Sequence, residues 1–223
     1  MPRQQMNPES LVVRDDLERA CEAAWQGIAS PGSWWTGAQR VALASIARDG
    51  RAGQDRALRG GEPDAAGEAQ LPAAAIEVAE VIAADAHRID RAWAREKIGV
   101  LGDAAYVEIV ALVACLTAMD AFAGAMGIDP QPLPAPRHGE PDRHRPEGLA
   151  DIGAHVDMID PFSGPNVARA LSLVPSDLMS FFGLVGAMYA AEDFSEIVWD
   201  RPLSRPQVEL VAARVSSLNE CFY

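Results

Sequence analysis

The amino-acid sequence predicts an all-α protein. Apolar residues recur at the spacing of one helix face in several segments, as Leu17, Cys21, Ala24 and Ile28 do in the first of them. No long run in which β-branched and polar residues alternate competes with this pattern. Apolar residues make up 49% of the chain and charged residues 23%, which is the balance of a globular protein. A chain of 223 residues is also long enough to bury a sizeable core.

The helices of the first half are bounded by capping residues and glycines. Ser10 and Thr36 are suitable N-caps, and Gly127 is a suitable left-handed C-cap. Five glycines between residues 50 and 67 predict a flexible polar stretch. Helices are therefore expected at 10–29, 36–47, 72–86, 90–98 and 103–126.

Prolines divide the second half of the chain. Residues 130–165 hold eight of the sixteen prolines, which excludes a regular helix and predicts a crossover on the surface. Helices are expected after it at 166–173, 177–190 and 203–215. The chain then divides into an N-terminal helical segment at 1–67, a first helical half at 68–130, the Pro-rich crossover at 131–165 and a second helical half at 166–223.

Charge and cysteine usage exclude several classes of protein. A net charge of −13 argues against nucleic acid and anionic membrane surfaces as partners, because both require a basic footprint. The longest apolar runs, at 109–119 and 181–191, are shorter than the roughly 18 residues of a membrane span. The start, MPRQQMNPES, has no apolar signal region, and the three cysteines lie too far apart for a disulfide framework. We therefore expect a cytoplasmic protein without a membrane partner.

Two helical segments resemble each other. When 103–122 is shifted by 101 positions onto 204–223, Glu108 meets Glu209 and apolar positions around the two glutamates coincide. The stretch 36–48 is a weaker third copy. Internal duplication explains the match, and so would three amphipathic helices that are alike by chance.

The second copy carries the candidate catalytic residues, Glu209 and Cys221. Twelve residues of straight helix span about 18 Å, so these two side chains cannot touch along one helix. Asn219 tolerates the left-handed conformation that ends helices, and a fresh turn after it would turn Cys221 back and stabilise its thiolate. The first copy has Asp120 in place of Cys221 and cannot perform thiol chemistry. The plainer interpretation of Glu209 is an exposed glutamate in the first turns of a helix.

The stretch VELVAARVSSLNECFY resembles the signature of the alkylhydroperoxidase D and carboxymuconolactone decarboxylase family of helical proteins. Redox members of that family carry a glutamate, a cysteine twelve residues later, a second cysteine after three more and a histidine after four more. Glu209 and Cys221 match the first two elements, while the other two would fall at positions 224 and 228. The stretches WWTGAQRVALA, DAAYVEIV and PLPAP resemble larger members, some of them selenoproteins.

The resemblance implies a peroxide-reducing thiol or selenol enzyme. Its partners would be a small hydroperoxide and a dithiol reductant, it would need no cofactor, and it would form homo-oligomers. In the larger members the residue that would match position 224 is a cysteine or a selenocysteine. The UGA codon of selenocysteine is otherwise read as a stop. We therefore expect these 223 residues to be the N-terminal part of the product, with little or no activity alone.

Two other functions remain open at this point. One is a non-redox enzyme of the same family, in which the glutamate acts as a general base on a small carboxylic acid. The other is a helical interaction module without catalysis. His138, Glu140, Asp142 and His144 could bind a metal ion, but a solvated charged loop is the better interpretation of this cluster. The same interpretation holds for the pair His155 and Asp157. Expected structural residues are the tryptophans at 25, 34, 35 and 93 and the buried thiols at 21 and 115.

Overall fold

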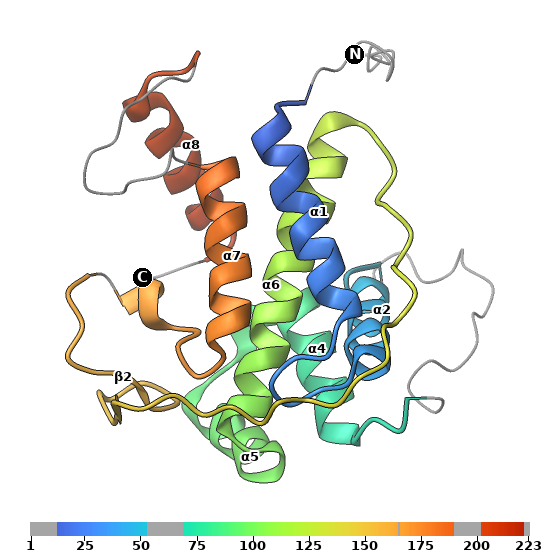
Figure 1. Ribbon diagram of the computed structural model, residues 1–223. Helices are drawn as coiled ribbons and strands as arrows, with labels where there is room; N and C mark the ends of the chain where they lie inside the picture. The colour runs from blue at the N-terminus through green and yellow to red at the C-terminus, as the bar shows by residue number, and fades with distance from the viewer. Residues whose placement is uncertain (1–12, 53–68, 165, 190–201, 221–223) are drawn as a thin grey trace.

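The computed structural model describes residues 13–52, 69–164, 166–189 and 202–220, and these are mostly helical (Figure 1). The α-helices are α1 (Asp15–Ala29), α2 (Gly37–Ala52), α4 (Ala73–Asp85), α5 (Arg91–Leu101), α6 (Asp103–Met126), α7 (Pro175–Met188) and α8 (Arg205–Leu218). Short 3-10 helices lie at η3 (Ala86–Arg88) and η4 (Asn166–Arg169). The mostly helical class is confirmed, but β1 (Leu149–Ala150) and β2 (Met158–Ile159) form a small antiparallel sheet that was not predicted.

Helix α6 lies at the centre of the bundle and contacts α1, α2, α4, α5 and α7. Because other helices surround it, α6 has no polar face, and more than half of its residues are buried. Its bounds match the prediction, and Gly127 ends it in the left-handed conformation with a φ of 71°. In the described part of the chain α6 is also the one helix long and apolar enough to cross a membrane, although a buried core helix has the same composition.

Several helix boundaries differ from the prediction. Thr36 caps α2 as expected, since its Oγ1 accepts a hydrogen bond from the Gln39 amide while the Gln39 side chain accepts from Thr36. Helix α2 nevertheless continues through Gly50, where the backbone of Glu80 on α4 packs close to the glycine. Helix α1 begins at Asp15, and the predicted cap Ser10 lies outside the described residues. The helix predicted at 166–173 is reduced to the 3-10 turn η4, and α7 begins at Pro175, two residues before its predicted start.

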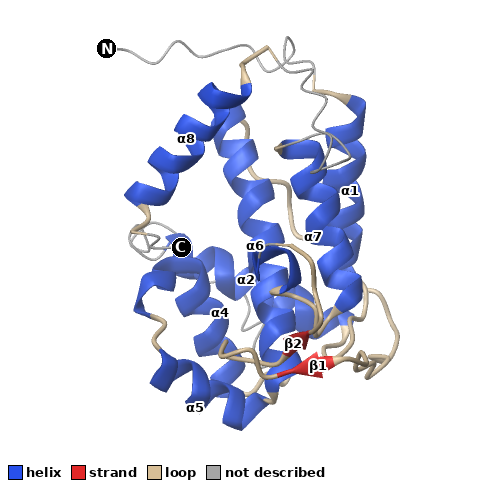
Figure 2. Cartoon of the chain, turned by 90° about the vertical axis from the view of Figure 1, so that its left-hand side faces the viewer, coloured by secondary structure: helices blue, strands red, loops and turns tan. Residues whose placement is uncertain are grey.

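The Pro-rich crossover runs over the outside of the bundle and is anchored to it at several points (Figure 2). The amide of Arg137 donates to the carbonyl of Ala29, and the amide of Arg143 donates to that of Ser33. The guanidinium of Arg145 forms two hydrogen bonds, of 2.8 and 2.7 Å, with the carboxylate of Asp103 at the start of α6. The predicted surface crossover is thus a fixed strap, and the β1–β2 hairpin lies in its second half.

One hydrophobic core joins the described helices from α1 to α7. Its largest fully buried side chains include Ile28, Leu43, Ile109, Leu116 and Leu184. Trp25 and Trp35 are buried in it, while Trp34 and Trp93 are half-buried at its edge, as expected of structural tryptophans. Helix α8 contributes no buried residue and lies at the periphery in both views (Figures 1 and 2).

Candidate functional site

The predicted catalytic residue Glu209 lies in the second turn of α8. Ser204 caps this helix, and its amide donates a 2.8 Å hydrogen bond to the side chain of Gln207. The predicted partner Cys221 lies outside the described residues. The structure therefore shows the environment of the carboxylate, and the relation of Glu209 to Cys221 stays a prediction.

The Glu209 carboxylate is joined to the end of α7. The hydroxyl of Tyr189 donates a 2.6 Å hydrogen bond to its Oε2, and Nε of Arg205 lies 3.4 Å from its Oε1. Chiefly because Tyr189 donates this bond, the pKa of Glu209 is lowered, and the pKa of the Tyr189 phenol is raised. Glu209 is thus an exposed glutamate in the first turns of a helix, as the plainer interpretation has it, and it also belongs to a Tyr–Glu–Arg cluster.

The chain leaves the helical path just before Cys221. Helix α8 ends at Leu218, and Glu220 has a left-handed φ of 55°. Asn219, which was expected to take the left-handed conformation, has a φ of −90° instead. The helix thus ends at the predicted place, while the left-handed residue is Glu220 rather than Asn219.

The two copies of the sequence repeat lie in opposite environments. Glu108 is fully buried in α6, while Glu209 is exposed on α8. Their N-caps also differ, since α6 is preceded by Gly102 and α8 by Ser204. Asp120, at the position equivalent to Cys221, forms ion pairs with Arg48 and Arg51 of α2. The sequence similarity thus does not extend to similar packing.

A buried ion network on α2, α6 and α7 was not predicted. The guanidinium of Arg40 contacts Oε1 of Glu108 through Nη1, and its Nη2 lies 2.7 Å from Oδ1 of Asp177. All three side chains are buried. The amide of Trp34 donates a 2.6 Å hydrogen bond to the other oxygen of Glu108. The signal in the sequence was a glutamate surrounded by apolar residues on every side of a core helix, since such a charge requires a partner.

Burial has the largest effect on the carboxyl group of Glu108 in this network. It raises the pKa of Glu108 above its ordinary value, and Arg40 opposes this effect. Cys115 lies nearby on the same helix, and burial together with the charge of Asp177 raises its pKa to about 12. A thiol with such a pKa is protonated and unreactive at neutral pH. The network is therefore a structural element that joins three helices.

The remaining candidates show no catalytic arrangement. Cys21 is half-buried, and burial raises the pKa of its thiol. His138, Glu140, Asp142 and His144 are exposed on the crossover, where Oδ1 of Asp142 accepts a hydrogen bond from the amide of His144. Across the residues that the structure describes, no three side chains of the metal-binding types gather as a metal site would require.

Comparisons with known proteins found no match: no family model, no curated protein and no solved structure matches the chain. The resemblance to alkylhydroperoxidase D therefore rests on Glu209, Cys221 and the other quoted stretches alone.

Proposed function

We propose that the protein is a thiol-dependent reductase of organic hydroperoxides, with Cys221 as the nucleophile and Glu209 as the group that transfers protons. The observation that carries the proposal is the hydrogen bond between Tyr189 and Glu209. It holds an ionised carboxylate on an accessible helix, twelve residues before the cysteine, at the spacing of the family motif. The end of α8 at Leu218 and the left-handed Glu220 are compatible with it, because the family motif needs a turn between the glutamate and the cysteine.

The reaction balances with a dithiol as the reductant. The Cys221 thiolate attacks the terminal oxygen of the hydroperoxide, the O–O bond breaks, and the alcohol leaves with a proton passed through Glu209. Cys221 becomes a sulfenic acid. One thiol of the reductant then displaces water to form a mixed disulfide, and its second thiol releases Cys221 and closes its own disulfide. Residue 224, where the family motif has its second cysteine or selenocysteine, would supply an internal partner for the same step.

Self-association is part of the proposal. Val211, Val215 and Leu218 follow one another at helical spacing along α8, and each has at least half of its surface exposed. Leu210 beside them is 72% exposed. Such a stripe on a helix without buried residues favours a homo-oligomer in which a second copy covers α8.

The test is consumption of cumene hydroperoxide in the presence of dithiothreitol. In a protein extended by the family pattern, Cys221→Ser should abolish turnover, while Cys21→Ser, which changes the half-buried thiol on α1, should keep it. Glu209→Gln should lower kcat/KM by about 10²-fold or more if the carboxylate transfers protons. A protein extended by the family pattern, with cysteine at 224 and histidine at 228, should be more active than the 223-residue chain. Turnover that persists in Cys221→Ser would overturn the proposal.

A further inference from the structure

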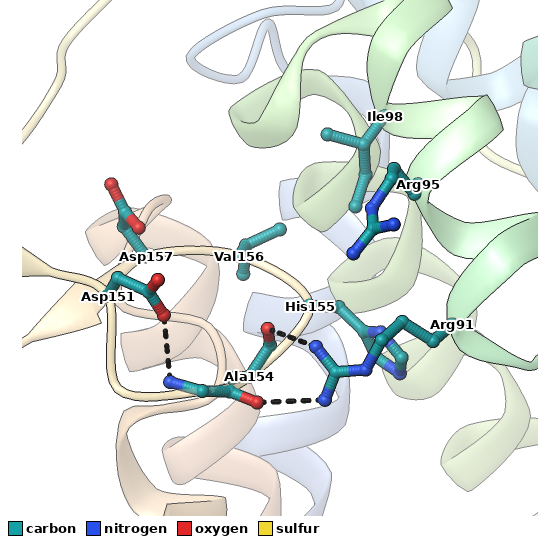
Figure 3. A pocket seen from close by; sticks show the side chains of 9 residues that line it. Arg91, Arg95, Ile98, Asp151, Ala154, His155, Val156 and Asp157 are labelled. Atoms are coloured by element: carbon teal, nitrogen blue, oxygen red, sulfur yellow. Dashed lines mark hydrogen bonds between the residues drawn. The ribbon is translucent and has the colours of Figure 1, made fainter.

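A pocket of about 290 Å³ lies between α5 and the tip of the β1–β2 hairpin (Figure 3). Arg91, Arg95 and Ile98 project into it from α5, where their spacing of four and three residues puts them on one helix face. The hairpin loop, residues 151–157, forms the other wall and contributes Val156. The pocket uses no residue of the proposed thiol chemistry.

Two sets of hydrogen bonds hold the loop in place. The guanidinium of Arg91 donates to the carbonyl oxygens of Gly153 and Ala154, at 2.9 and 3.4 Å. Oδ1 of Asp151 accepts a 2.8 Å hydrogen bond from the amide of Gly153, whose φ of 83° is left-handed. The wall opposite α5 is therefore formed before any ligand arrives.

The side chain of Arg95 has no hydrogen-bond or ion-pair partner among the described residues. Its guanidinium points into the pocket (Figure 3). Arg91 lies four residues before it, and two cations at this spacing repel each other. An anion placed between them would remove that repulsion.

The acidic residues of the lining limit the charge of a ligand. Asp151 is engaged with the Gly153 amide. Asp157 lies close enough to Arg145 to add to the rise in its pKa, which comes mainly from the hydrogen bonds with Asp103. Both carboxylates remain at the wall, so a multiply charged anion such as phosphate meets more repulsion than a single carboxylate does.

We propose that this pocket binds small aliphatic monocarboxylates. The planar fork of Arg95 matches the two oxygens of a carboxylate, and Arg91 adds positive charge while it holds the loop. Ile98 and Val156 offer apolar surface to a short hydrocarbon chain. The pocket volume suits a chain of a few carbons.

The test is a titration of the 15N-labelled protein with sodium butyrate, followed by NMR. Amide shifts should change at 91–98 and 151–157, and affinity should rise from acetate to butyrate by up to about fourfold per methylene. Arg95→Gln should weaken butyrate binding by about tenfold or more. Arg19→Gln, which removes an exposed arginine on α1, should leave binding unchanged.

Three outcomes would overturn the proposal. The first is a wild-type protein whose amides at 91–98 and 151–157 do not respond to butyrate. The second is equal affinity in Arg95→Gln and wild type. The third is tighter binding of inorganic phosphate than of butyrate, which would assign the pocket to another class of anion. The state of Cys221 affects none of these measurements, so they are independent of the peroxidase assay.

Discussion

The hydroxyl of Tyr189 donates a 2.6 Å hydrogen bond to Oε2 of Glu209 and so joins the end of α7 to α8. This contact fixes the position of the carboxylate that we place in the proposed reaction. It also determines the pKa of Glu209, which can be tested without the proposed reaction.

Tyr189→Phe should raise the pKa of Glu209. The Tyr189 hydroxyl is the main cause of the lowered pKa of this carboxylate, and Arg205 contributes less. Arg205→Gln should therefore raise the pKa by a smaller amount. The measurement is a 13C NMR titration of the Glu209 carboxyl carbon in the three proteins. An unchanged midpoint in Tyr189→Phe would show that the hydrogen bond does not form in solution.

Arg40→Met should destabilise the fold severely. It removes the only described cation that contacts Glu108 and Asp177, and two buried carboxyl groups then face each other. Breaking a buried ion pair in this way costs about 3–5 kcal/mol. The matched control is Arg51→Met, because Asp120 keeps Arg48 as its partner and lies nearer the surface. Urea unfolding gives both free energies, and equal losses in the two variants would contradict a central role of Arg40.

Glu108→Gln should remove a pH-dependent part of the stability. Burial raises the pKa of Glu108 above its ordinary 4.5, so the folded protein binds this proton more tightly than the unfolded chain does. Such a group contributes its full stability below the unfolded pKa and loses it as the pH rises through the folded pKa. Wild type should therefore lose stability relative to the variant as the pH rises from about 4.5 towards neutral.

Urea unfolding of both proteins at pH 5 and pH 7 gives the free energy of unfolding of wild type minus that of Glu108→Gln. We expect this difference to decrease as the pH rises. An increase would mean that the ion pair with Arg40 outweighs burial and that Glu108 is ionised in the fold.

Val211→Asp should dissociate the proposed oligomer. The substitution places a charge in the exposed apolar stripe of α8, where a partner surface would have to bury it. Ala213→Asp is the control, because Ala213 lies on the opposite side of the same helix. Sedimentation velocity should give an oligomer for wild type and for the control, and a monomer for Val211→Asp. A wild-type monomer would refute self-association through this face.

The sequence predicted the elements whose signals are local. Helix α6 is bounded by Asp103 and Gly127, and its long apolar pattern left little alternative. The β1–β2 strands have two residues each, which is too short for an alternating pattern, so the hairpin gave no signal. The end of α2 was placed too early because Gly50 was interpreted as a breaker, whereas its packing against Glu80 depends on a helix distant in sequence.

The candidate site was predicted only in part for the same reason. The spacing of Glu209 and Cys221 is a local pattern and could be recognised. The partner of Glu209 could not, because Tyr189 lies twenty residues away, at the C-cap of α7. Arg40, the partner of Glu108, lies 68 residues before it, and the second partner of Arg40, Asp177, lies 137 residues after Arg40. Pairings of this kind depend on how helices pack, and no periodicity within one helix reveals them.

The loop before α2 passes very close to the buried ion network. A Cβ atom added at Gly32 would overlap Oε1 of Glu108 and Nη1 of Arg40. A side chain at position 32 therefore requires either a displaced loop or the loss of the charged pair beneath it. Among descendants of this sequence, glycine at 32 and the charges at 40 and 108 should be inherited together or exchanged together. The smallest residue of the loop thus constrains the evolution of the core it covers.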